Sequence, residues 1–306
     1  MTPLQAPPAA IVEIAREWGL QLVSGTDSRY SHTWFVMAGE RHLVLKVGER
    51  SARLREAAAL STYELGAGPG QPPACRVLRL APDVGEGTAA LLLERVLLGD
   101  DLRPLARTDD DAATEVMAEV VRELHRAARD SGPMGEPAGP GDEPAPTLPH
   151  LATLLGTFDD YAAAREQPLP RALVLRARGL ATELTAVSTG DIVLHGDLHH
   201  ANVLRSGVGD GADRWRAIDP HGWVGDPAFD TAAFLLNPQD VVDQHCDPAG
   251  LALRRASILA EGTGIEAARI LAWALVGGVV SELWCWADHG FVAGGALRLA
   301  EALAGR

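Results

Sequence analysis

The chain has 306 residues, of which 47% are hydrophobic and 22% are charged, and its formal net charge is −14 at neutral pH. This length and composition are typical of a soluble globular protein with a large core. The acidic balance argues against a nucleic-acid partner and against an anionic membrane, since both attract basic surfaces, whereas it would suit a cationic small molecule.

The first third of the chain predicts a small sheet with two helices. Residues 9–19 carry apolar and charged positions at helical spacing. Residues 51–65 predict a second helix, for which Ser51 is the candidate N-cap. Five short runs are typical of strands and predict a five-stranded sheet, namely residues 20–23, 33–37, 41–47, 76–80 and 89–94.

The rest of the chain predicts a mainly helical region. A strongly amphipathic helix over residues 109–128 is followed by a Pro-, Gly- and acid-rich segment, 129–149, which we expect to be a mobile loop. A short hairpin over 202–205 and 214–218 interrupts the helices, and residues 191–194 lead into the loop before it. The remaining predicted helices cover residues 151–165, 169–187 and 229–236, and most of 240–306.

Neither a membrane span nor a secretory signal is expected. The apolar run 270–280 has eleven residues before Ser281 and Glu282, which is too short to cross a bilayer and indicates a buried helix. The first ten residues have neither a basic nor a long apolar part. Three widely separated cysteines, Cys75, Cys246 and Cys285, show neither disulfide nor metal spacing, so we expect a cytoplasmic protein.

Of the 27 lysine and arginine residues, Lys46 is the only lysine, and all the others are arginines. It lies in the apolar run 42–47, near the end of a predicted strand. A compact ammonium group can reach phosphate oxygens inside a cleft where a planar guanidinium would not fit. The retained lysine therefore indicates a phosphate-binding role.

A polar string downstream carries the chemistry. It reads His195-Gly-Asp197-Leu-His-His-Ala-Asn202, and Ile218-Asp219-Pro follows the predicted hairpin. Asp197 can accept the proton of an attacking hydroxyl, while Asn202 and Asp219 offer the hard oxygens that Mg²⁺ prefers. The hairpin brings these two to one spot, and we expect His195 to hold the loop by hydrogen bonds. The pattern predicts phosphoryl transfer from a magnesium-bound nucleotide.

The same string resembles the aminoglycoside phosphotransferases, which carry H-G-D-x-x-x-x-N and I-D motifs. The resemblance continues into Gly225-Asp226-Pro-Ala-Phe-Asp230, and residues 91–96 and the length are most similar to the streptomycin 6-kinase and hydroxyurea phosphotransferase branch. It implies an α+β, protein-kinase-like bilobal fold. Residues 1–95 would form a nucleotide-binding N-lobe with a small five-stranded antiparallel sheet, and residues 96–306 a larger, mainly helical C-lobe with the substrate pocket.

The resemblance also implies how ATP is held between the lobes. Glu56 would pair with Lys46 and orient it toward the phosphates. Ser28 lies in the loop 24–29, which would cover the phosphates, and the backbone of Glu94 and Val96 would form the hinge that binds adenine.

Asp226 would brace the catalytic loop in this family, although N-capping of the following helix explains it equally well. A basic acceptor needs carboxylates and aromatic faces in the C-lobe, although helical tryptophans more often lie in the core. The candidates are Asp159, Asp160, Glu282, Trp284 and Asp288.

The predicted function is an ATP- and Mg²⁺-dependent O-phosphotransferase that acts as a monomer on a hydroxyl of an aminoglycoside, first of all streptomycin. One alternative is a kinase of another small hydroxylated molecule, such as hydroxyurea, choline, fructosamine or a macrolide. Another alternative, from a different class, is a nucleotide-binding module without catalysis.

Overall fold

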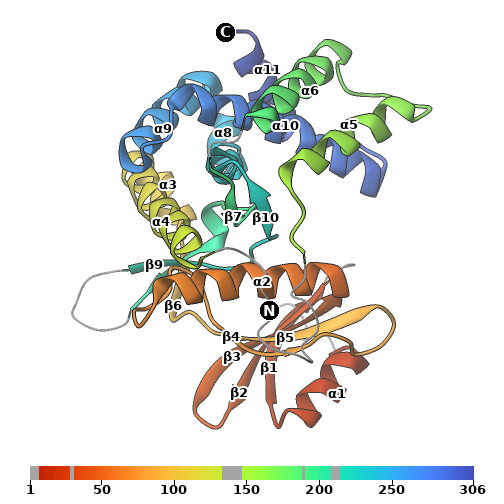
Figure 1. Cartoon of the computed structure of the whole chain (residues 1–306), viewed down its shortest axis with the longest axis vertical. Helices are drawn as coiled ribbons and strands as arrows, with labels where there is room; N and C mark the ends of the chain where they lie inside the picture. The colour runs from red at the N-terminus through yellow and green to blue at the C-terminus, as the bar shows by residue number, and fades with distance from the viewer. Residues whose placement is uncertain (1–6, 28–30, 133–146, 188–189, 208–213) are drawn as a thin grey trace.

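The five predicted strands form one antiparallel sheet in the order β1-β2-β3-β5-β4. The structure is a computed structural model, and it describes residues 7–27, 31–132, 147–187, 190–207 and 214–306. The sheet lies at one end of the molecule, below the helical part in Figure 1. The strands are β1 (Gln21–Asp27), β2 (Ser31–Ala38), β3 (Arg41–Glu49), β4 (Val77–Ala81) and β5 (Thr88–Glu94).

Strand alternation assigns the two faces of this sheet to two helices. Leu45 packs with the buried residues of α1 (Ala9–Glu17) on one face. Lys46, the next residue of β3, points to the opposite face, where its strand partner Leu91 joins the core formed with α2 (Arg50–Ala67). Because successive side chains of a strand alternate, Lys46 is directed at α2.

The start of α2 differs from the prediction. The N-cap position is Glu49, and Ser51 already lies in the first turn, where its hydroxyl donates to the Glu49 carboxylate. The prediction of Ser51 as the N-cap was therefore wrong, because the strand β3 runs directly into the helix without a separate turn.

The helical part surrounds one long apolar helix, α10, which packs against α5, α6, α7, α9 and α11 (Figure 1). The predicted buried helix over 270–280 is confirmed, and it extends in both directions. By length and composition alone α10 could cross a membrane, but 56% of its most apolar window is buried in the protein, as in a core helix. The helices are α3 (Arg103–Thr108), α4 (Asp110–Asp130), α5 (Leu154–Ala163), α6 (Arg171–Ala186), α7 (Ala232–Leu235), α8 (Gln239–Gln244), α9 (Pro248–Thr263), α10 (Ala267–His289) and α11 (Gly295–Ala304).

Short strands lie between the large sheet and the helices (Figure 1). The predicted hairpin is confirmed as β8 (Val203–Ser206) and β9 (Arg214–Ala217), and β8 also pairs with β6 (Leu98–Asp101). Residues 191–194, which lead into the catalytic loop, contain a further strand, β7 (Ile192–Leu194), which pairs with β10 (Trp223–Gly225).

The expected α+β architecture, a five-stranded antiparallel sheet followed by a mainly helical lobe, is confirmed. The boundary between residues 95 and 96 falls between β5 and β6, and it stays a prediction. Most of the predicted loop over 129–149 lies outside the described residues, while α4 continues to Asp130.

Candidate active site

A glycine and a histidine shape the loop that follows β7. Gly196 has a φ of +80°, and a Cβ atom there would lie 2.3 Å from Cδ1 of Trp223, so both the backbone and the space require glycine. His195 is fully buried. Its Nε2 bonds to the carbonyl of Ile218 at 2.9 Å, and its Nδ1 accepts from the backbone N–H of Asp197 at 3.3 Å. These are the supporting contacts expected of His195.

A second buried carboxylate, Asp230, holds the same loop. It accepts from the backbone N–H of Gly196 at 2.8 Å and of His195 at 3.3 Å, and it bonds to Nε2 of His125 at 2.9 Å. One side chain therefore holds the catalytic loop against α4, a role that the sequence pattern did not predict for Asp230.

Asp226 has the capping role that was one of the two expected for it. Its carboxylate accepts from the backbone N–H of Ala228 at 3.1 Å, at the start of the 3₁₀ turn Pro227–Thr231. It also accepts from Nε of Arg269 at 2.6 Å and from the indole of Trp273. Of the two roles considered for Asp226, capping is therefore confirmed, and the carboxylate also joins the turn to α10. A brace to the catalytic loop stays a prediction.

The hairpin β8–β9 brings Asn202 and Asp219 together, because they flank its paired ends. The backbone N–H of Ile218 donates to the carbonyl of Asn202 at 2.9 Å. The amide nitrogen of Asn202 donates to the backbone carbonyl of Asp197 at 2.9 Å, which leaves the amide oxygen for a cation. Asp219 has a φ of +62°, a strained conformation that non-glycine residues adopt mainly at functional sites.

Lys46 joins the two lobes at this point. Its Nζ lies 2.7 Å from Oε1 of Glu56 and 2.7 Å from Oδ1 of Asp219. Burial alone would lower the pKa of Lys46, but the two carboxylates outweigh it and raise the pKa, so the ammonium stays charged. Against the effect of burial, Lys46 lowers the pKa of Asp219 to about 2. The pairing expected between Lys46 and Glu56 is thus present.

Asp197 is suited to accept a proton near neutral pH. Burial, and next the negative charge of Asp219, raise the pKa of Asp197 to about 7, while the hydrogen bond from Asn202 opposes this. Its side chain is 32% exposed, and Oδ2 lies 3.6 Å from Nε2 of His199 and 3.7 Å from Nε2 of His221. A base whose pKa is close to the working pH is the most effective in general catalysis.

A cavity of about 610 Å³ opens beside Asp219. Its walls come from β1 and β2, from α2, from the segment that contains Asp219 and His221, and from the end of α10. Trp284 and Asp288 form the α10 wall, so two of the five predicted acceptor residues face this cavity.

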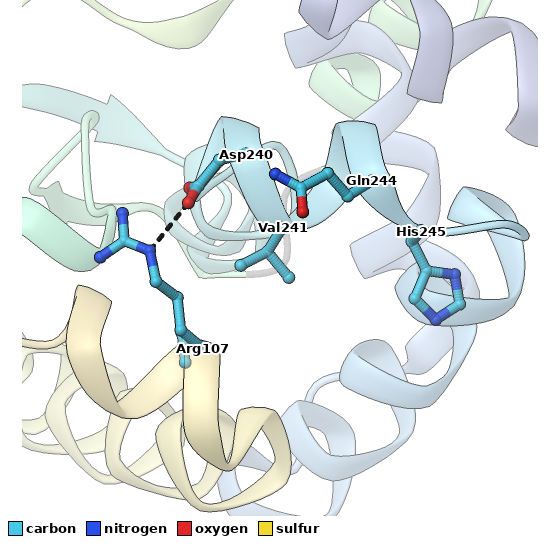
Figure 2. Close-up of a pocket in the computed structure, with 6 residues that line it drawn as sticks. Arg107, Asp240, Val241, Gln244 and His245 are labelled. Atoms are coloured by element: carbon cyan, nitrogen blue, oxygen red, sulfur yellow. Dashed lines mark hydrogen bonds and ion pairs between the residues drawn. The ribbon is translucent and has the colours of Figure 1, made fainter.

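A second cavity, of about 390 Å³, lies between α3 and α8. Figure 2 shows that Arg107 and Asp240 face each other there, with Nε and Oδ2 2.8 Å apart. None of the predicted site residues is among the described residues that line it, so the cavity beside Asp219 is the better candidate.

Residues 20–290 match the family described as aminoglycoside/hydroxyurea antibiotic resistance kinase. The chain belongs to this family. It is 30% identical to the streptomycin 6-kinase of Streptomyces griseus over 313 residues, which covers 97% of this chain and 89% of that protein. It is 34% identical to the streptomycin 3''-kinase of Klebsiella pneumoniae over 204 residues, or 65% of this chain and 67% of that protein.

The solved structures agree on the fold of this kinase. The aminoglycoside phosphotransferase APH(4)-Ia, in ternary complex with AMP-PNP and hygromycin B, superposes with a TM-score of 0.63 at 17% identity, covering 97% of each chain. The expected protein-kinase-like bilobal fold is therefore confirmed, and the kinase is a small-molecule phosphotransferase by family.

The other three predicted acceptor residues of the kinase lie away from the cavity. Glu282 is 2% exposed, and its carboxylate accepts from backbone N–H groups at the start of α11, at 3.0 and 3.1 Å. Asp159 is exposed and pairs with Arg178 at 2.8 Å. Neither Asp159 nor Asp160 is among the described residues that line the cavity. The prediction for Glu282 is corrected, because its buried carboxylate is used by the backbone of the neighbouring helix. Those for Asp159 and Asp160 stay predictions.

The predicted hinge segment is anchored by a buried arginine. The Glu94 carboxylate receives two hydrogen bonds from Arg216, at 2.9 and 2.8 Å, and Arg216 is 2% exposed. The backbone N–H of Glu94 donates to the carbonyl of Arg76 at 3.0 Å within the sheet. Adenine binding by the backbone of Glu94 and Val96 stays a prediction, and Ser28 lies outside the described residues.

His195 makes the stability of the kinase sensitive to acid. Burial lowers the pKa of His195 to about 4 from its ordinary value of 6.5. Between these values the unfolded chain binds a proton that the folded protein does not, so the folded state loses stability as the pH falls. The free energy of unfolding of the wild type should therefore fall when the pH is lowered from about 7.5 to about 5.5. In a His195→Gln variant we expect this fall to be smaller by about 1 kcal/mol.

Urea denaturation at the two pH values measures this difference. His42→Gln, at an exposed position of β3, provides the control for the loss of a histidine. Equal losses for the wild type and His195→Gln would contradict the prediction.

Proposed function

We propose that this kinase transfers the terminal phosphoryl group of magnesium-bound ATP to a hydroxyl of an aminoglycoside, with streptomycin as the first candidate. The observation that carries the proposal is that Lys46, Asp197, Asn202 and Asp219 come together from three separate parts of the chain, and that Asp219 lines a cavity. The streptomycin kinases among its relatives support the choice of acceptor.

In the proposed reaction, Asp197 takes the proton of the acceptor hydroxyl. The acceptor oxygen forms a bond to the γ-phosphorus, and the bond from that phosphorus to the bridging oxygen breaks, so that ADP leaves with the electron pair. Orientation of the hydroxyl matters more than the basicity of Asp197, because the transition state of phosphoryl transfer is loose.

The donor side of the site fits a magnesium nucleotide. The free amide oxygen of Asn202 and the partly exposed carboxylate of Asp219 are hard oxygen ligands, and Mg²⁺ needs only one or two of these besides phosphate and water. The bound ion would neutralise phosphate charge. Lys46, held between Glu56 and Asp219, would contact the inner phosphates.

The acceptor side fits a cation. Trp284 and Asp288 are four residues apart on α10 and therefore lie on one face of the helix, toward the cavity. A carboxylate beside an aromatic face suits a guanidinium or ammonium group. Hydroxyurea and macrolides would make weaker contacts with Trp284 and Asp288, since hydroxyurea has no cationic group and a macrolide has few.

Purified protein with Mg²⁺, ATP and streptomycin should release ADP and give a product heavier by one phosphate group. The assay should include other aminoglycosides and the alternative acceptors hydroxyurea, choline, fructosamine and a macrolide. If only one of these alternative compounds is phosphorylated, that compound is the acceptor and streptomycin is not. Nucleotide binding without ADP release for any acceptor would instead support the non-catalytic alternative.

A further inference from the structure

Two arginines of α2 at the cavity beside Asp219 have hydrogen-bond donors that no described residue accepts from. Arg53 and Arg55 both line this cavity. The Nε atom of each guanidinium is buried and has no hydrogen-bond partner within the described part of the chain. A buried donor without an acceptor is costly, and in a native protein it often marks the place of an absent ion or ligand.

The charges around these arginines also favour an anion. Nη1 of Arg53 lies 2.5 Å from Oε2 of Glu56, whose other oxygen contacts Lys46 at 2.7 Å. Lys46 in turn contacts Asp219. On this side of the cavity three cations, Lys46, Arg53 and Arg55, therefore face two carboxylates. The excess positive charge can be balanced by a bound anion.

The opposite wall has the opposite charge, because it carries Asp288 beside Trp284. An anionic group that enters between the walls therefore lies against α2, and a cationic molecule lies against α10. Asp219, the proposed Mg²⁺ ligand, borders the same cavity. If the nucleotide binds there, the part of it that reaches Arg53 and Arg55 would be its terminal phosphate.

We infer that Arg53 and Arg55 bind the terminal phosphate of the donor nucleotide, on the side that faces the acceptor. The inference rests on the proposed function and adds two residues to the phosphoryl-binding set. A guanidinium presents paired N–H groups that match two phosphate oxygens, which a lysine does not. Arg53 would also keep Glu56 in place when Lys46 contacts phosphate instead of Asp219.

The affinities for AMP-PNP and ADP, measured by calorimetry with Mg²⁺, test the inference. In Arg53→Gln and in Arg55→Gln the affinity for AMP-PNP should fall by about tenfold or more, while that for ADP should change by less than about twofold. Turnover should fall by about 10²-fold. A purely structural role would weaken both nucleotides alike.

Arg50 provides the matched control on the same helix. Its side chain is 42% exposed and lies 3.6 Å from Asp83, so Arg50→Gln should leave the AMP-PNP to ADP ratio unchanged. If the loss of the Glu56 contact prevents Arg53→Gln from folding, Arg55→Gln alone decides. An unchanged ratio in the folded arginine variants, together with wild-type turnover, would overturn this inference alone. If the wild-type protein shows no turnover with any acceptor, the proposed function itself is contradicted.

Discussion

Asp197→Asn will abolish most of the turnover and leave nucleotide binding intact. The amide cannot accept the proton of the acceptor hydroxyl, although it keeps the shape of the side chain and can still bond to Asn202. Loss of a positioned general base lowers the rate by roughly 10²–10⁴-fold. ADP release with the best acceptor measures kcat, and calorimetry with AMP-PNP measures binding.

The matched control is an exposed aspartate outside the site. Asp111 is 53% exposed and pairs with Arg254 on the surface at 2.9 Å, so Asp111→Asn should keep wild-type turnover. A kcat for Asp197→Asn that stays within about threefold of the wild type would refute the role of Asp197, since even the weakest general bases contribute more.

Lys46→Ala and Lys46→Arg will both lower kcat/KM, by roughly 10²–10³-fold, as expected for the loss of one preorganised charge. Arginine should not restore activity, because Lys46 is 7% exposed and its Nζ fits within 2.7 Å of two carboxylates. A guanidinium is larger and planar, and forcing it into this space costs about 1–3 kcal/mol. Steady-state kinetics and thermal denaturation separate the loss of activity from the loss of stability.

The reverse exchange on the same strand serves as the control. Arg41 is exposed at the start of β3, so Arg41→Lys should change neither kcat nor stability. If Lys46→Arg retains wild-type kcat/KM, the single lysine has no specific phosphate-binding function, and its retention in an arginine-rich chain is incidental.

Local patterns in the sequence were enough to predict the centre of this site. Asn202 and Asp219 are joined by a hairpin, so their meeting follows from strand pairing alone. Alternation along β3 likewise places Lys46 opposite the face that contains Leu45. Such predictions succeed because they depend on residues that are near one another in the chain, or on the alternation of side chains between the two faces of a strand.

Predictions about side-chain partners on helices were less successful. Glu282 and Asp288 are six residues apart on α10, yet Glu282 caps α11 and Asp288 faces the cavity. Asp230 lies four residues after Asp226, yet it is Asp230 that holds the catalytic loop. Helical rotation separates such neighbours, and the sequence does not state which neighbouring element each face will contact.

By itself, the sequence predicted the order of the strands along the chain and the candidate residues for phosphoryl transfer, because both depend on short-range spacing, and its resemblance to the aminoglycoside phosphotransferases implied the fold class. Only the tertiary structure decided which charges meet. The contact of Lys46 with Asp219, and the cavity that joins Arg53 and Arg55 of α2 to Asp288 of α10, bring together residues far apart in the chain. Their distances depend on how the two lobes pack, and packing is a property of the whole core.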